Sequence, residues 1–160
     1  MTDAELLVAA LRERGWTLGV AESLTGGAVA SEIVSVPGAS AALLGGVVAY
    51  ATPLKHTLLG VDAALLAEHG AVHPDVAAQM AEGVRRAVAV DDRPADVGIA
   101  TTGIAGPDSP DGQPVGTAHI GVVTPGCARS IPHLFGGTRA QIRAQATAAA
   151  IAAALAAARE

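Results

Sequence analysis

Short apolar runs that suit β-strands alternate along this chain with longer stretches of helical spacing. Strand-like runs occupy residues 16–21, 45–51, 95–102, 117–123 and 129–135. Between them, segments bounded by glycine or proline place apolar residues three and four positions apart, as amphipathic helices do. Such alternation is typical of α/β proteins with a mainly parallel sheet and helices on both faces. We therefore expect an α/β fold, a three-layer α/β/α sandwich with about five strands.

The segments that join these elements carry recognisable start and stop signals. Thr124-Pro125-Gly126 joins the last two strands and suits a hairpin, which would make the sheet mixed. Residues 103–116 form a loop rich in glycine and proline, and loops of this length are usually functional or mobile. Helices are expected to start at Thr2 or Asp3, Ala28, Thr52-Pro53, Asp62, Pro74 and Thr138.

Composition narrows the class of protein. The 160 residues suit one domain spanning 1–160, and 51% hydrophobic residues with 16% charged residues exclude a disordered chain. A net charge of −5 and few aromatic residues exclude nucleic-acid binding. A single cysteine, Cys127, excludes a disulfide framework. The acidic N-terminus is unlike a signal peptide, and the apolar stretch 146–158 is too short to cross a membrane, so we expect a soluble cytoplasmic protein.

Ligands of α/β proteins bind where strands end and helices begin, and reactive side chains follow three of the expected strands. In segment 22–27, Ser23 presents a hydroxyl on a turn whose free backbone N–H groups suit an anion or an oxyanion. The alternative is that Ser23 or Thr25 merely caps the next helix. In segment 101–107, hydroxyls and glycines let the backbone approach a ligand closely, and the alternative is a tight turn.

The segment from Tyr50 to Lys55 holds the only tyrosine and the only lysine, because the other nine basic residues are arginine. A desolvated lysine can lose its proton and act as a general base beside a serine, whereas arginine cannot. The alternative is a surface lysine and an ordinary tyrosine. Arg139 opposes the dipole at the start of the last helix, which suits an anionic ligand or, alternatively, a solvated charge. His69 and His73 do not share a helical face, so no metal site is expected.

Several motifs occur together in one order: AESLTGG at 21–27, VPGAS at 36–40, GGVVAY at 45–50, HGAV at 69–72, TGIAGP at 102–107 and PVGT at 114–117. Together with Lys55, they resemble the CinA C-terminal domain family, whose enzymes are nicotinamide-nucleotide amidohydrolases. The resemblance runs from about Leu6 to the last helix. Several motifs in the right order make it far more specific than any one of them alone.

The resemblance implies hydrolysis of the carboxamide of nicotinamide mononucleotide (NMN), giving nicotinic acid mononucleotide and ammonia. It implies an α/β/α fold, a small-molecule nucleotide as substrate, no cofactor or metal, and commonly a homodimer. The family's catalytic groups fall on Ser23, Ser40, Tyr50, Lys55 and Thr102. Substrate-binding positions fall on Thr25, Gly26, Gly27, Gly103, Gly106 and Arg139.

These residues predict a mechanism in which Lys55, kept neutral by burial, takes a proton from Ser23 or from a water held by Ser23 and Ser40. Tyr50 would connect the lysine to the serine. Backbone N–H groups near the glycines of 26–27 and 103 would stabilise the oxyanion. Arg139 or a helix N-terminus would hold the phosphate. The sequence leaves open which serine is the nucleophile.

The chain departs from the family pattern at two places. Leu24 stands where cysteine is frequent, and Ala51-Thr52-Pro53-Leu54 replaces the usual Ser-Asn-acidic-Ala. The second departure favours an alternative, a non-catalytic nucleotide-binding module linked to competence or DNA-damage responses. A further alternative is the same chemistry on another small amide. Larger members carry an N-terminal molybdopterin-binding-like domain, so this chain is expected to represent the stand-alone form.

Overall fold

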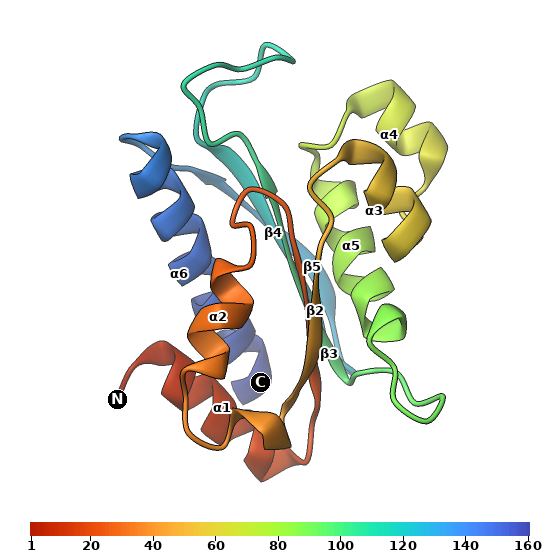
Figure 1. Cartoon of the computed structure of the whole chain (residues 1–160), viewed down its shortest axis with the longest axis vertical. Coiled ribbons are helices and arrows are strands. Elements are labelled where there is room, and N and C mark those ends of the chain that lie inside the picture. Colours follow the sequence, from red (N-terminus) through yellow and green to blue (C-terminus); the bar gives the residue numbers. More distant parts are fainter.

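A five-stranded sheet with the strand order β2-β1-β3-β4-β5 forms the middle of the molecule, and the computed structural model describes all 160 residues (Figure 1). β1 pairs in parallel with β2 and β3, whereas β4 runs antiparallel to both β3 and β5. The sheet is therefore mixed, and the predicted hairpin joins its last two strands. The strand bounds are Leu18–Glu22 (β1), Leu43–Val48 (β2), Val97–Gly103 (β3), Thr117–Val123 (β4) and Ala128–Leu134 (β5).

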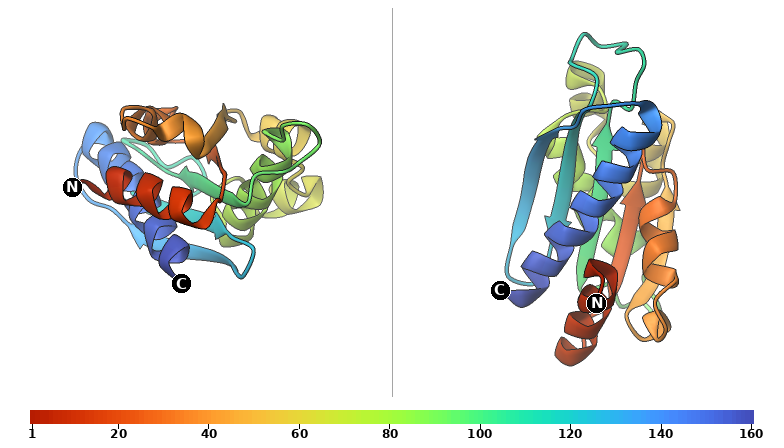
Figure 2. Two further views of the ribbon diagram at one scale, coloured as in Figure 1. Left: turned by 90° about the horizontal axis from the view of Figure 1, so that it is seen from below. Right: turned by 90° about the vertical axis from the view of Figure 1, so that its left-hand side faces the viewer.

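Helices cover both faces of the sheet, which confirms the predicted three-layer α/β/α architecture. One face carries α1 (Asp3–Arg14), α2 (Ala28–Val34) and α6 (Arg139–Arg159), which lie side by side in the right-hand view of Figure 2. The other face carries α3 (Thr52–Leu59), α4 (Ala63–His69) and α5 (Pro74–Ala87). A short 3-10 turn, η1 (Ala39–Ala41), precedes β2. None of these helices combines the length and the apolar character that a membrane span requires.

Each face of the sheet packs on its own apolar core. The core under α1, α2 and α6 includes Leu11, Val20 and Ile151, and the core under α5 includes Met80 and Val84. Small buried alanines of α6 let that helix pack closely on α1. Gly98 and Gly121 of the sheet let α5 pack closely on the sheet. These cores fix the sheet as a rigid base for the loops at its edge.

Several predicted strand boundaries shift by a few residues, and two of the shifts have clear local reasons. The first strand starts at Leu18 rather than residue 16, because the Trp16 N–H donates to the Leu11 carbonyl at the end of α1. The second ends at Val48 rather than residue 51, because the carbonyls of Ala49 and Tyr50 accept from Lys55 Nζ. The chain therefore leaves the sheet where the predicted site begins.

The carboxyl ends of β1, β2 and β3 lie at one edge of the sheet, since these three strands run in parallel. Ser23 follows β1, Tyr50 comes two residues after β2, and the loop 104–116 follows β3 at that same edge (Figure 1). Segments far apart in the sequence therefore meet there, as expected for an α/β sheet.

Candidate active site

Lys55 on α3 is a buried side chain, 1% exposed, and all three of its polar contacts are at the sheet edge. Its Nζ lies 3.0 Å from Ser23 Oγ, 2.8 Å from the Ala49 carbonyl and 3.3 Å from the Tyr50 carbonyl. The carbonyls can only accept, so they take two N–H groups of the amine. The remaining position on nitrogen faces Ser23 and holds an N–H when the lysine is charged or a lone pair when it is neutral. A proton can therefore pass between Ser23 and Lys55.

Burial lowers the pKa of Lys55 to about 8 from 10.5, because the protein interior solvates an ammonium less well than water does. None of the ion pairs in the structure involves Lys55, so no carboxylate opposes this effect. At this pKa, about a tenth of the molecules hold the neutral amine at pH 7 and about half at pH 8. Lys55, which the sequence predicts to be kept neutral by burial, is thus neutral in only a minority of molecules at pH 7, and this fraction grows with pH.

Ser23 is held by the end of the neighbouring strand β3. Its N–H donates to the Thr101 carbonyl at 3.1 Å and also lies 3.3 Å from Thr101 Oγ1. The hydroxyl of Thr25 lies 2.8 Å from Thr101 Oγ1, and both threonines are fully buried. Thr25 therefore ties the turn to β3. It is not among the residues that line the cavity, unlike what its predicted role in substrate binding would require.

Glu22 occupies the start of α2, where an anion was expected to bind. Its two carboxylate oxygens accept from the N–H groups of Val29 at 2.9 Å and Ala30 at 3.0 Å. Gly26 and Gly27 adopt positive φ angles of 58° and 102°, which the turn requires, and neither lines the cavity. These glycines shape the turn, and the N-terminus of α2 already holds a protein carboxylate in place of a phosphate.

Arg143 on α6 clamps the same turn and was not predicted from the sequence. Its Nε donates to the Leu24 carbonyl at 2.9 Å and its Nη2 to the Thr25 carbonyl at 3.1 Å. Arg143 lies one helical turn after Arg139, so the i, i+4 spacing of two arginines was the available signal.

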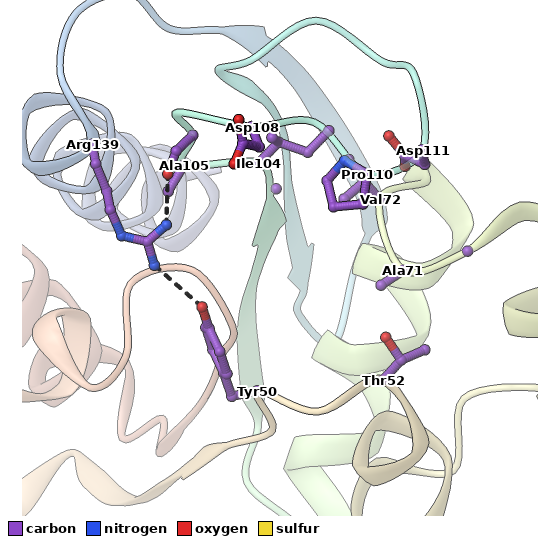
Figure 3. Close-up of a pocket in the computed structure, with 13 residues that line it drawn as sticks. Tyr50, Thr52, Ala71, Val72, Ile104, Ala105, Asp108, Pro110, Asp111 and Arg139 are labelled. Carbon is purple, nitrogen blue, oxygen red and sulfur yellow. Dashed lines mark hydrogen bonds between the residues drawn. The ribbon is translucent and has the colours of Figure 1, made fainter.

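Tyr50 and Arg139 meet at the mouth of the site rather than at the lysine. The Tyr50 side chain is 60% exposed, and its hydroxyl accepts from Arg139 Nη2 at 3.2 Å. Arg139 Nη1 donates to the Gly106 carbonyl at 2.7 Å, and dashed lines mark both hydrogen bonds of Arg139 in Figure 3. The predicted link from lysine to serine through the Tyr50 hydroxyl is therefore not formed, and Tyr50 reaches Lys55 through its backbone carbonyl.

The structure brings Thr102, Gly103 and Gly106 to the site but leaves Ser40 away from it. Thr102 Oγ1 donates to the Ala71 carbonyl at 2.7 Å, which ties β3 to the segment before α5. Gly106 has a φ of 82°, and a Cβ there would lie 2.5 Å from Val115 Cγ1. Ser40 lies in η1, exposed, before the start of β2, whereas Tyr50 lies beyond its end. The sheet therefore separates Ser40 from Ser23, and the proposed chemistry does not include Ser40.

A cavity in two connected compartments opens over these residues. The inner compartment, about 260 Å³, reaches Ser23, Lys55 and Thr102. The outer compartment, about 360 Å³, extends beneath the loop that carries Asp108 and Asp111 (Figure 3). Both compartments share these residues: Tyr50, Thr52, Ala71, Val72, Gly103, Ala105 and Arg139. The size suits a small organic ligand that reaches the serine at one end.

Several backbone N–H groups of residues that line the inner compartment have no hydrogen-bond partner in the chain. They include those of Leu24, directly after Ser23, and of Ala105 on the loop after β3. A nucleophilic hydroxyl, a buried base and unpaired N–H donors are the groups that acyl-transfer chemistry requires. The arrangement can therefore support attack of Ser23 on a carbonyl carbon.

Sequence comparison assigns the chain to a family. The CinA C-terminal domain model matches residues 2–157. A CinA-like protein of Frankia casuarinae is 52% identical over 115 residues, which make up 72% of this chain and 25% of that protein. A putative competence-damage inducible protein of Limosilactobacillus reuteri is 48% identical over 126 residues, 79% of this chain and 29% of that protein. The chain thus spans about a quarter to a third of the curated relatives it matches.

Solved structures agree with this assignment over the whole chain. A competence-damaged protein (CinA) superfamily protein from Klebsiella pneumoniae has a TM-score of 0.89 at 33% identity and covers 99% of both chains. The corresponding superfamily protein from Escherichia coli has a TM-score of 0.84 at 31% identity, covering 98% of this chain and 90% of that one. With the family model matching residues 2–157 and the same fold in solved structures of the superfamily, this chain belongs to the CinA C-terminal domain family.

Proposed function

We propose that this protein is an amidohydrolase that converts NMN and water into nicotinic acid mononucleotide and ammonia. The observation that carries the proposal is the contact between the buried Lys55 amine and the Ser23 hydroxyl at the end of a ligand-sized cavity. Amide hydrolysis needs a base that later protonates a poor leaving group, and a lysine with a pKa of about 8 can serve in both steps. The choice of NMN rests on the family resemblance.

The chemistry proceeds through an acyl-enzyme. Neutral Lys55 takes the Ser23 proton as Ser23 Oγ attacks the carboxamide carbon, and the C–N bond breaks as Lys55 returns that proton to the leaving nitrogen. Ammonia departs and leaves an ester on Ser23. Lys55 then takes a proton from water, whose oxygen attacks the ester, and returns it to Ser23 Oγ. The nicotinate carboxyl group is released and the enzyme is restored.

The developing oxyanion needs donors beside Ser23. The unpaired N–H groups of Leu24 and Ala105 are the donors we assign, in place of Gly26, whose N–H donates to the Ser23 carbonyl. A donor of this kind contributes about 3 kcal/mol to transition-state stabilisation in comparable enzymes.

Arg139 is the group we assign to the substrate phosphate. It is bound to two neutral oxygens, the Gly106 carbonyl and the Tyr50 hydroxyl, and makes no ion pair within the chain. No carboxylate of the chain therefore pairs with its charge, and several of its N–H groups can donate to a ligand anion at the junction of the two compartments.

Release of ammonia from NMN tests the proposal. Purified protein should release ammonia and nicotinic acid mononucleotide in equal amounts, and a quenched reaction should carry the acyl group on the peptide containing Ser23. The Lys55→Met variant should lose activity by about a hundredfold or more, since it removes the base. Ammonia no faster than from Lys55→Met protein would refute the proposal.

A non-catalytic nucleotide-binding module is the second candidate, and two observations favour it. The relative from L. reuteri is named for competence and damage rather than for an activity. Thr52-Pro53 also departs from the family pattern at the cavity wall. Binding of NMN without ammonia release would support this candidate. Ammonia from a panel of other small carboxamides, but not from NMN, would instead point to a different amide substrate.

The proposal extends to a homodimer formed along the outer side of β2. β2 is an edge strand, and exposed apolar side chains of Val48, Leu54 and Leu58 lie on it or on the helix that follows. Apolar side chains beside an unpaired strand edge favour association. Sedimentation should therefore give the mass of two chains, and Leu58→Asp should shift it toward one. A wild-type protein of monomer mass at every concentration would refute the dimer.

A further inference from the structure

The loop 104–116 contacts Arg139 of α6 and carries Asp108, so two groups of opposite charge line the same cavity without forming an ion pair. Gly106 binds Arg139 through its carbonyl, and two residues later Asp108 lines the outer compartment. No ion pair joins Arg139 and Asp108, and the Asp108 carboxylate makes no hydrogen bond within the chain. Figure 3 shows Asp108 on the loop above the cavity, between Arg139 and Asp111.

The other carboxylate of the loop is already in use. Both oxygens of Asp111 accept from Gln113, one from its backbone N–H at 3.1 Å and one from Nε2 at 2.8 Å. Gln113 Nε2 also donates to the Val72 carbonyl at 2.9 Å, which ties the loop to the opposite wall of the outer compartment. Asp111 therefore serves the loop, and Asp108 is the carboxylate left free to accept from a ligand.

A guanidinium without an ion pair and a carboxylate without a hydrogen bond, both on residues that line one cavity, complement a ligand that carries an anion and hydroxyl donors. A sugar phosphate has this combination, since its phosphate pairs with arginine and its vicinal hydroxyls donate to a carboxylate. We propose that Asp108 recognises the ribose hydroxyls of the substrate and makes the site selective for ribonucleotides over 2′-deoxyribonucleotides. This inference rests on the proposed function for the placement of the phosphate on Arg139.

Sugar phosphates without a carboxamide test this inference separately from catalysis. Ribose 5-phosphate and 2-deoxyribose 5-phosphate are titrated into the protein by calorimetry. Hydrogen bonds to a charged acceptor predict that wild-type protein binds the ribose form about tenfold more tightly or better. Asp108→Ala should bring the two affinities within about twofold, and Asp108→Asn should fall between, since an amide oxygen still accepts but carries no charge.

Asp92→Asn is the matched control, because it removes the same charge away from the cavity at a positive φ of 60° that asparagine tolerates. It should leave the ribose preference unchanged. Equal binding of both sugars by wild-type protein, binding of neither, or a preference that survives Asp108→Ala would overturn the inference. If the preference depends on Asp108 but NMN yields no ammonia, the inference stands and the amidohydrolase proposal falls. If NMN yields ammonia while the preference does not depend on Asp108, only the inference falls.

Discussion

Lys55 is the residue on which the proposed chemistry depends. A buried ammonium is costly, and here two carbonyls and a serine hydroxyl surround the nitrogen without any carboxylate to neutralise it. An arginine in this place would keep its proton, and this chain, whose other nine basic residues are arginine, has a lysine where the proposed chemistry requires proton transfer. The environment lowers the pKa of Lys55 far enough for the neutral base to exist near physiological pH.

The lowered pKa predicts the pH dependence of the reaction. Because the neutral amine is the active form, kcat/KM for NMN should rise about tenfold per pH unit below pH 7 and level off above about 8. Lys55→Arg keeps the charge but cannot accept the proton, and it should lose activity about a hundredfold or more. Initial rates of ammonia release from pH 5.5 to 9.5 measure both effects. A profile that is flat, or that falls with pH in this range, would show that Lys55 is not the base.

Arg139 should act mainly on substrate binding. Arg139→Gln removes the charge assigned to the phosphate, so KM for NMN should rise about tenfold to a hundredfold while kcat changes less. Arg93→Gln is the matched control, since Arg93 is exposed and lies outside both compartments of the cavity. Steady-state kinetics of the two variants measure this effect. A loss confined to kcat would show that Arg139 does not bind the phosphate.

The residues of the site could be predicted only where a sequence motif also fixes a residue's place at the end of a strand or helix. Ser23, Lys55 and Arg139 meet at one cavity because each lies at or next to a strand or helix end that the sequence marks with glycine, proline or threonine. Ser40 belongs to one of the motifs that carry the family resemblance, but it lies before β2, at the opposite end of that strand from its carboxyl end. The contacts of Arg143 span 118 and 119 residues in sequence, so only the folded chain reveals them.

At the scale of elements, glycines set how closely α5 lies on the sheet. A Cβ on Gly98 of β3 would collide with the Ala81 carbonyl, and a Cβ on Gly121 of β4 would collide with the Ala77 carbonyl. Both carbonyls belong to the rigid backbone of α5, so neither can move aside without shifting the helix. The close approach in turn places segment 70–72, just before α5, against the cavity.

Gly121→Ala should therefore destabilise the protein. Overpacking against a backbone carbonyl costs about 1–3 kcal/mol, which should appear as a lower urea midpoint with an unchanged slope. Gly126→Ala in the β4–β5 turn is the control, since a Cβ there meets nothing within 4 Å and its φ is not positive. Equal midpoints for Gly121→Ala and wild-type protein would show that α5 can move away from the sheet without cost.

Element order was predictable because each helix has a local start signal, as the capping boxes at Thr2 and Thr138 illustrate. Strand order was not predictable in the same way. β1 lies between β2 and β3, and no single segment of the sequence carries a signal for this order. The boundary at Val48 depends on Lys55, so it required the tertiary structure as well.

At the scale of the whole molecule, the core under α5 and the site are coupled through α3, the helix that carries Lys55. α3 carries this side chain into the protein, and Leu59 on the same helix packs in the core under α5. The Leu59 carbonyl would also collide with a Cβ on Gly83 of α5, so α3 and α5 pack at backbone contact. Folding of this face therefore forces the amine out of water, and the protonation of one group becomes linked to the stability of the entire fold.

This linkage predicts that stability rises with pH in the alkaline range. Lys55 has a pKa near 10.5 when the chain is unfolded and about 8 when it is folded, so between these values the unfolded chain binds more protons. The free energy of unfolding should increase by about 2 kcal/mol from pH 8 to 9.5 relative to Lys55→Met, whose side chain does not titrate. Between pH 7 and 8 the difference between the two proteins should change by only about 0.4 kcal/mol, because the folded lysine there passes from about nine-tenths to about half protonated. Urea unfolding at pH 7, 8 and 9.5 measures the difference, and identical responses of the two proteins throughout would mean that the folded state keeps its lysine charged.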